Sequence, residues 1–170
     1  MEIPTIAELS EKLKKSEIFQ KFKSEYPDTF FCAGFFILNF KSGVFDYSLD
    51  YRNDKQIFSF KIPLGESKNI IMEVSDIFEK QTPLPEINCD VQVDIEELRG
   101  IIEENLFKNS IKNKLEELIA VLQIIEGSKV WNLTCMCEGF TIISAQIHSE
   151  TAGVLKFEKR NLLDFVKRAK

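Results

Sequence analysis

The chain has 170 residues, of which 44% are hydrophobic and 29% are charged, a composition typical of a folded protein with one core. Its formal net charge of −5 argues against a general nucleic-acid binder, which usually carries a basic excess. The first residues, MEIPTIAELSEK, lack the apolar core of a signal peptide, and no stretch approaches the ~18 apolar residues of a membrane-spanning helix. We therefore expect a cytoplasmic protein with reduced cysteines, no membrane association and no cofactor.

The first half of the chain predicts a helix followed by an antiparallel meander. Thr5 and Glu8 have the spacing of a capping box, and apolar residues then recur at helical intervals up to Pro27, with a break at Ser16. Strands are expected at residues 29–40, 44–51, 57–62 and, with the weakest pattern, 70–74. Apolar and polar residues alternate in 44–51, which predicts a strand with one face on the core and one in water.

A second unit is predicted after a linker at 81–88, where Pro83 and Pro85 interrupt every periodic pattern. Asp94 and Glu97 predict the start of a helix. Another helix is predicted over residues 111–125, because the apolar residues recur there at alternating intervals of four and three. These residues are Ile111, Leu115, Leu118, Leu122 and Ile125. Strands are expected at 129–137, 140–149 and 154–160, followed by a closing helix from Leu162.

Together these elements predict an α+β protein with antiparallel β-meander sheets, helices packed on one face and two tandem α-β-β-β units. Residues 1–80 form the N-terminal helix and meander, and residues 81–88 form the proline-containing linker. Residues 89–170 form a helical pair, a second meander and a C-terminal helix. We expect the two halves to share one core.

The second unit, a helix and a three-stranded meander whose last turn reads SETAGVLKFE, resembles the PepSY domains and, more loosely, the cystatin-like folds. The resemblance covers residues 94–160, and residues 5–62 are similar as a divergent copy. It implies the helix-plus-meander architecture. It also implies a module that binds other proteins or modulates peptidases, in a family whose members are mostly exported or membrane-attached.

No group of residues has the spacing of a known catalytic or metal site. Cys135 and Cys137 share a strand face with Trp131, which predicts packed thiols rather than zinc ligands. His148, the single histidine, falls on the polar face of its strand and is expected to be solvated. Asp46 and Asp50 lie about 13 Å apart along a strand, too far for a glycosidase pair. We therefore predict a protein without catalytic, metal-binding or cofactor-binding residues, and hence not an enzyme.

The stretch TFFCAGFFILNF at residues 29–40 is apolar on both faces of the predicted strand. One face carries Phe30, Cys32, Phe36, Leu38 and Phe40, and the other carries Phe31, Ala33, Phe35 and Ile37. If the second face were exposed, it would form an unusually large apolar patch. It could be covered by the chain's own halves, by a protein partner or second copy of the chain, or by an apolar ligand. Phe31, Phe35 and Ile37 are thus the candidate interface or ligand face.

Three functions are compatible with these observations. The leading hypothesis is a non-enzymatic protein-interaction or regulatory module, with a protein partner or a homodimer. The alternative is a binding protein that holds an apolar small molecule in the concave face of its sheet. The third is a nucleic-acid-associated role for a basic patch near the C-terminus, although nucleic acid is the least expected partner. That patch consists of Lys159, Arg160, Lys167 and Arg168.

Overall fold

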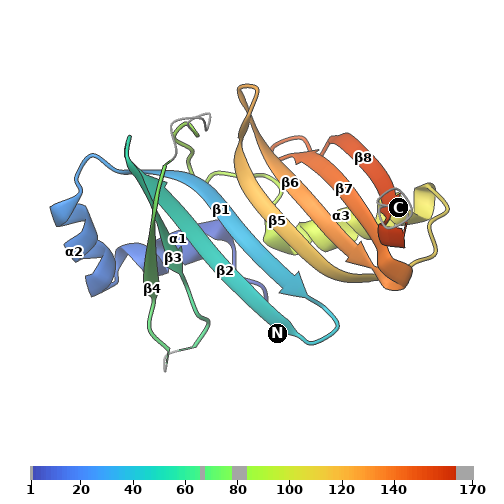
Figure 1. Cartoon of the computed structure of the whole chain (residues 1–170), viewed down its shortest axis with the longest axis horizontal. Helices are drawn as coiled ribbons and strands as arrows, with labels where there is room; N and C mark the ends of the chain where they lie inside the picture. Colours follow the sequence, from blue (N-terminus) through green and yellow to red (C-terminus); the bar gives the residue numbers. More distant parts are fainter. Residues whose placement is uncertain (1, 66–67, 78–83, 164–170) are drawn as a thin grey trace.

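A computed structural model describes residues 2–65, 68–77 and 84–163 (Figure 1). The α-helices in this part of the chain are α1 (Ile6–Lys14), α2 (Glu17–Glu25) and α3 (Ile95–Lys108). The strands are β1 (Phe30–Asn39), β2 (Val44–Arg52), β3 (Gln56–Lys61), β4 (Ile71–Asp76), β5 (Leu115–Ile125), β6 (Ser128–Cys137), β7 (Thr141–His148) and β8 (Val154–Asn161). A short 3-10 turn (Glu138–Phe140) joins β6 to β7.

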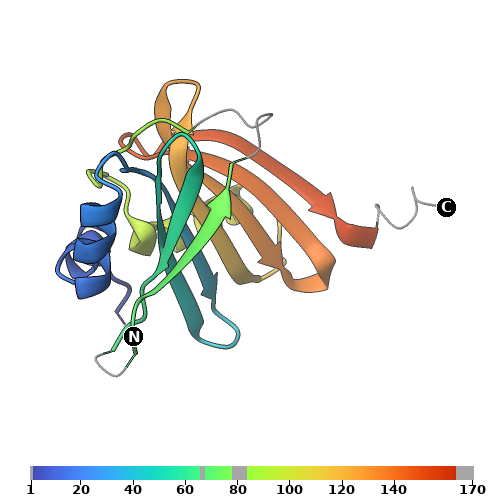
Figure 2. The same ribbon diagram turned by 60° about the vertical axis from the view of Figure 1, so that its left-hand side comes forward.

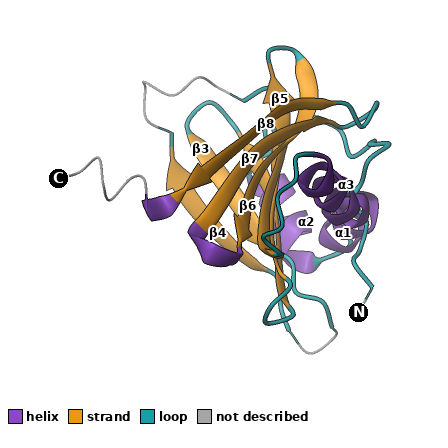
Figure 3. Cartoon of the chain, turned by 90° about the vertical axis from the view of Figure 1, so that its right-hand side faces the viewer, coloured by secondary structure: helices purple, strands orange, loops and turns teal. Residues whose placement is uncertain are grey.

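All eight strands belong to one antiparallel sheet in the order β4-β3-β2-β1-β5-β6-β7-β8. The two halves of the chain meet at its centre, where β1 pairs with β5 and Phe35 lies opposite Val121. Figure 3 shows α1, α2 and α3 on the same side of the sheet. The predicted α+β fold with antiparallel meanders and helices on one face is therefore confirmed. The first half contributes the four strands expected from its sequence, the second half contributes four rather than three, and the meanders join into one continuous sheet.

Local capping sets the starts of the helices. The Thr5 hydroxyl accepts the N–H of Glu8, whose carboxylate accepts the N–H of Thr5 at 2.8 Å. Ser16 separates α1 from α2 and caps α2 by accepting the N–H of Phe19. Asp94 caps α3, and it also accepts the N–H of Ile6 at 3.0 Å. One carboxylate thus ties the first helix of each half to the other.

The core lies between the sheet and the helices. Under α2 it is aromatic: the Phe22 ring lies 4.8 Å from Phe58 and 4.9 Å from Phe60, centroid to centroid. Under α3 it centres on Trp131 of β6, which is fully buried. The Trp131 indole donates to the carbonyl of Val93 at 2.8 Å, just ahead of α3. Both helical layers are therefore held by large buried side chains from the same sheet face.

The prediction of a helix over residues 111–125 is wrong: residues 111–114 form a loop and residues 115–125 form β5, the partner of β1. The register of β5 on β6 shifts between Leu115 and Glu117, so a β-bulge inserts one residue there. The bulge places Leu115 on the same buried face as Leu118 and Leu122. Those three positions reproduce the 3-and-4 spacing of a helix within an extended strand. The predicted helical pair is consequently one helix and one strand.

A second bulge changes the faces of β1. The register of β1 on β2 shifts between Phe31 and Ala33, which makes Cys32 the extra residue. Phe31 consequently lies on the helix side, opposite Tyr51, and is 7% exposed. Phe35 and Ile37 stay on the other side. The expectation that Phe31 shares a face with Phe35 and Ile37 is therefore wrong.

The two regions predicted to lie outside the meanders differ in how far the structure describes them. Of the predicted linker, residues 84–88 are described and run along the first half, with the N–H of Ile87 bonded to the carbonyl of Phe31 at 2.9 Å. Ile87 is buried, so this part packs on the core. The closing helix is described only at residues 162–163, which are helical. Its remainder lies outside the described residues.

Candidate functional site

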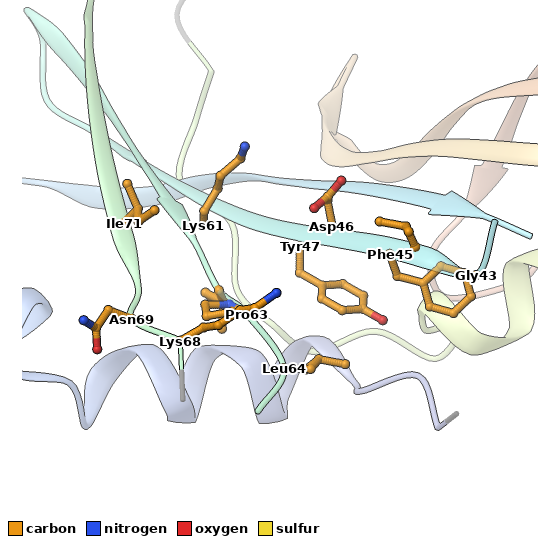
Figure 4. Close-up of a pocket in the computed structure, with 12 residues that line it drawn as sticks. Gly43, Phe45, Asp46, Tyr47, Lys61, Pro63, Leu64, Lys68, Asn69 and Ile71 are labelled. Atoms are coloured by element: carbon orange, nitrogen blue, oxygen red, sulfur yellow. The ribbon is translucent and has the colours of Figure 1, made fainter. Parts of the chain in front are cut away.

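A cleft opens where β3 leaves β2. The two strands pair from Arg52–Ile57 to Ser48–Lys61, and the last bond between them joins the N–H of Ile62 to the carbonyl of Tyr47 at 2.8 Å. Pro63 follows, and the chain turns away toward β4. Residues 44–46 of β2 therefore have no strand beside them on this side among the described residues. The resulting cleft has a volume of about 670 Å³ and lies at the end of the sheet near α1 (Figure 4). Figure 2 shows the ribbon of α1 and α2 on one side of the strands of the first half.

The lining is mainly apolar. The apolar and aromatic side chains are Val44, Phe45, Tyr47, Ile62, Pro63, Leu64 and Ile71. The polar ones are Asp46, Lys61, Lys68 and Asn69. In Figure 4, Phe45 and Tyr47 project to one side of β2, whereas Asp46 and Lys61 project to the other. The part of the cleft on the helix side of β2, called the chamber below, is thus mainly apolar. The carboxylate of Asp46 lies on the other side of the strand.

Tyr47 carries a buried hydroxyl without a partner. Its side chain is 2% exposed, and the hydroxyl oxygen has no hydrogen bond to any described residue. Burial raises the pKa of Tyr47 to about 12, so the hydroxyl stays protonated at neutral pH. In Figure 4 it is directed toward the ring of Phe45, which is partly buried. An unsatisfied buried hydroxyl costs about 1–3 kcal/mol, which makes this position exceptional in the core.

Two lysine side chains lie at the cleft on its helix side: Lys68 lines it, and Lys12 contacts Pro63 in its wall. Lys68 is exposed, makes no ion pair with a described residue, and extends toward the Tyr47 ring in Figure 4. The ammonium of Lys12 on α1 donates to the carbonyl of Pro63. This bond fixes the start of the β3–β4 connection against α1, and with it one wall of the cleft.

The opposite face of the sheet holds a smaller hollow of about 270 Å³. Phe35 and Ile37 line it, and Phe35 is 38% exposed. Its polar residues are Asp46, Ser48, Asp50, Ser59, Lys61 and Glu73. The structure therefore brings two of the three predicted face residues together beside carboxylates and places the third, Phe31, in the core.

Asp50 makes the stability of the protein sensitive to pH. Burial raises the pKa of its carboxyl above the ordinary value of 3.8, and the facing Ser59 opposes that rise. Because the folded state binds the proton more tightly, stability is expected to fall as the pH rises from 3.8 through the raised pKa. The Asp50→Asn variant should unfold at higher urea concentration than the wild type at pH 7, with the difference shrinking toward pH 4. An unchanged difference across that range would contradict this assignment, and Asp46→Asn controls for the loss of one charge.

Cys135, Cys137 and His148 contribute to packing and to a turn. Cys135 and Cys137 are buried on the face of Trp131, as predicted, and burial raises the pKa of both thiols. Within the described ranges, no three His, Cys, Asp or Glu side chains are placed to hold a metal ion. The Nδ1 atom of His148 accepts the N–H groups of Glu150 and Thr151, each at 3.3 Å, which supports the turn before β8.

The structure describes half of the predicted basic patch. Lys159 and Arg160 are exposed on β8, an edge strand of the sheet. The guanidinium of Arg160 lies 3.5 Å from the carboxylate of Glu158. Lys167 and Arg168 lie outside the described residues.

Sequence reasoning did not find the cleft, although one signal for it was present. The alternation of β2 begins at Val44, whereas the pattern of its partner stops before Pro63. A strand of nine residues beside one of six must leave part of its edge unpaired, and Pro63 sits where the shorter strand ends.

Comparison with known proteins supports the fold and no more. No family model matches the chain, and no curated protein matches it by sequence. A solved structure with a similar fold is a "putative lipoprotein" from Clostridium difficile 630. It is 14% identical with a TM-score of 0.55, and the match covers 85% of this chain and 91% of that one. At this identity the likeness concerns the fold alone. None of the described helices is long and apolar enough to cross a membrane.

Proposed function

We propose that this protein is a non-enzymatic binding protein that holds a small molecule with an apolar body in the cleft beside β2. The observation that carries the proposal is the Tyr47 hydroxyl, which is buried without a partner among the described residues in the wall of a 670 Å³ cleft. Ligand sites are typically clefts of about 300–1,000 Å³ with apolar walls and a few polar groups that orient the ligand. The cleft has that size and that division of side chains.

An apolar body is favoured by the side chains that the cleft leaves in contact with water. Leu64 and Ile71 are 40% and 56% exposed, and Phe45 is only partly buried. A ligand that covers them gains about 25 cal/mol for each Å² of apolar surface removed from water. The sequence-based alternative placed such a ligand in the concave face of the sheet, whereas the cleft lies at the end of the sheet and has a larger volume than the hollow beside Phe35, about 670 Å³ against 270 Å³.

The protein-interaction hypothesis and the nucleic-acid hypothesis stay predictions. Phe35 and Ile37 would serve a protein partner on the sheet face opposite the helices, and the support for this use is that Phe35 is exposed and Ile37 half-buried. For nucleic acid, Glu158 lies beside the one described arginine of the basic patch and partly neutralises it. The cleft supports small-molecule binding more strongly, since it combines a volume, apolar walls and an unpaired polar group.

The Leu64→Asn variant tests the proposal against the matched variant Leu155→Asn. Both leucines are exposed, but Leu64 lines the cleft and Leu155 lies on β8. Titration with the neutral probe N-phenyl-1-naphthylamine, followed by fluorescence, is expected to show saturable binding to the wild type. Leu64→Asn should weaken binding about fivefold or more, the effect of ~1 kcal/mol of lost apolar contact.

Leu155→Asn should bind the probe like the wild type. Equal losses in both variants, or no saturable binding to the wild type, would contradict the proposal. Circular dichroism and urea unfolding of the variants confirm that each is folded when the probe is added.

A further inference from the structure

We infer that the ligand of this cleft is a carboxylate-headed amphiphile, whose apolar chain lies along Phe45 and Leu64 and whose carboxylate is bound by Lys68 and Tyr47. This inference rests on the proposed function and adds the chemical class of the ligand. The ligand class is inferred from the polar groups that face the chamber and from whether they donate or accept hydrogen bonds.

The polar side chains on the helix side of the cleft are donors. Lys68 offers an ammonium group and Tyr47 a protonated hydroxyl. Asp46, the carboxylate in the lining, projects to the other side of β2, and Asn69 points away from Tyr47 (Figure 4). A ligand head that meets donors must supply acceptor oxygens, and a carboxylate supplies two.

The local charge supports an anion in the same place. The chain as a whole carries a net charge of −5, yet the ammonium groups of Lys12 and Lys68 both lie at this end of the sheet. The nearby carboxylates of Asp46, Asp50 and Glu73 line the hollow on the other face. The hollow also contains the ammonium of Lys61, so carboxylates are in excess there without being the sole charged groups. The helix side of the cleft is faced by Lys68, and an anionic head is expected there.

The position of Phe45 sets the requirement for entry. The Tyr47 hydroxyl is directed toward the Phe45 ring, and its oxygen is closed to solvent. Because this oxygen is closed to solvent, a ligand head can accept its proton only if side chains beside it move. Phe45 is partly buried, lines the cleft and lies on that side of Tyr47 in Figure 4, so we expect its ring to turn when the ligand binds. The hydrogen bond then formed gives the Tyr47 hydroxyl an acceptor, which contributes to the affinity for the ligand.

The test compares ligands that share a chain and differ in the head. Isothermal titration calorimetry of the full chain at pH 7 would use decanoate, decan-1-ol, decylammonium and acetate, each below its micelle concentration. Decanoate is expected to bind about tenfold more tightly than decan-1-ol, the effect of one charge-assisted hydrogen bond. Acetate should show no saturable binding in the range where decanoate saturates.

Two pairs of variants locate the head. Lys68→Gln should weaken decanoate binding about tenfold and leave decan-1-ol unchanged, whereas Lys55→Gln, in the turn at the other end of the β2–β3 hairpin, should change neither. Tyr47→Phe should weaken decanoate binding without lowering the stability of the free protein, because it removes an unpaired hydroxyl. Tyr51→Phe, a buried tyrosine outside the cleft, should leave binding intact.

Several outcomes of these titrations would overturn the assignment of a carboxylate head. Equal affinities for decanoate and decan-1-ol, tighter binding of decylammonium, or no effect of Lys68→Gln would overturn the carboxylate assignment. In those cases saturable binding of N-phenyl-1-naphthylamine would leave the proposed function standing. Failure of that probe together with decanoate would overturn both.

Discussion

Replacing Trp131 with alanine is expected to lower the free energy of unfolding by about 3–5 kcal/mol. The side chain is fully buried, and its ring lies 5.8 Å from that of Phe36, centroid to centroid. Its indole N–H also satisfies the carbonyl of Val93, which would be left without that partner. The loss therefore combines a cavity at the centre of the sheet with an unpaired acceptor at the start of α3. Equilibrium unfolding in urea measures it.

Two further variants separate these contributions. Trp131→Phe keeps most of the packing and removes the bond to Val93, so a smaller loss of about 1–2 kcal/mol is expected. Phe107→Ala removes an aromatic ring that is 86% exposed on α3, and it should change stability by less than about 0.5 kcal/mol. A loss below about 1 kcal/mol for Trp131→Ala would contradict the assigned role of this residue.

Replacing Gly34 with alanine is expected to destabilise the protein by about 1–3 kcal/mol, although alanine is usually tolerated better than glycine in a strand. A Cβ atom at this position would lie 2.8 Å from two ring carbons of Phe36. Phe36 is fully buried between Trp131 and Tyr47, so its ring has little room to move. Urea unfolding of the variant measures the loss.

The control has the opposite expected sign. A Cβ atom added at Gly100 on α3 would meet no other atom within 4 Å, so Gly100→Ala should stabilise the helix by about 0.5–1 kcal/mol. Combining Gly34→Ala with Phe36→Leu should cost less than the sum of the two single changes, because the smaller side chain relieves the contact. Additive losses, or a stabilised Gly34→Ala variant, would show that the close approach is absent.

The buried centre of the sheet and the candidate site are neighbouring regions of the molecule. Trp131, Phe36 and Gly34 lie where β1, β5 and β6 join the two halves. The cleft lies at the free half of β2, where β3 has turned away and the backbone has one neighbour strand fewer. Tyr47 connects the two regions, since its ring lies 6.2 Å from that of Phe36 and also lines the cleft.

Much of the fold could be predicted from local patterns. The caps at Thr5 and Asp94, the break at Ser16 and the alternation of β2 depend on residues a few positions apart. The same holds for the shared buried face of Trp131, Cys135 and Cys137. Such features follow from hydrogen bonds and side-chain directions within one element, so neighbouring residues suffice to predict them.

The tertiary structure decided whether residues 111–125 are helix or strand, on which side Phe31 lies, and that a cleft exists. Pairing with β1 makes residues 115–125 a strand, and a bulge at its start produces the spacing of a helix. Another bulge at Cys32 turns Phe31 toward the core. The lining of the cleft combines Tyr47 of β2 with Leu64 and Lys68 of the β3–β4 connection, which are brought together by the fold. Bulges and clefts arise from how separate strands pair, and the sequence of one strand alone does not contain its partner's register.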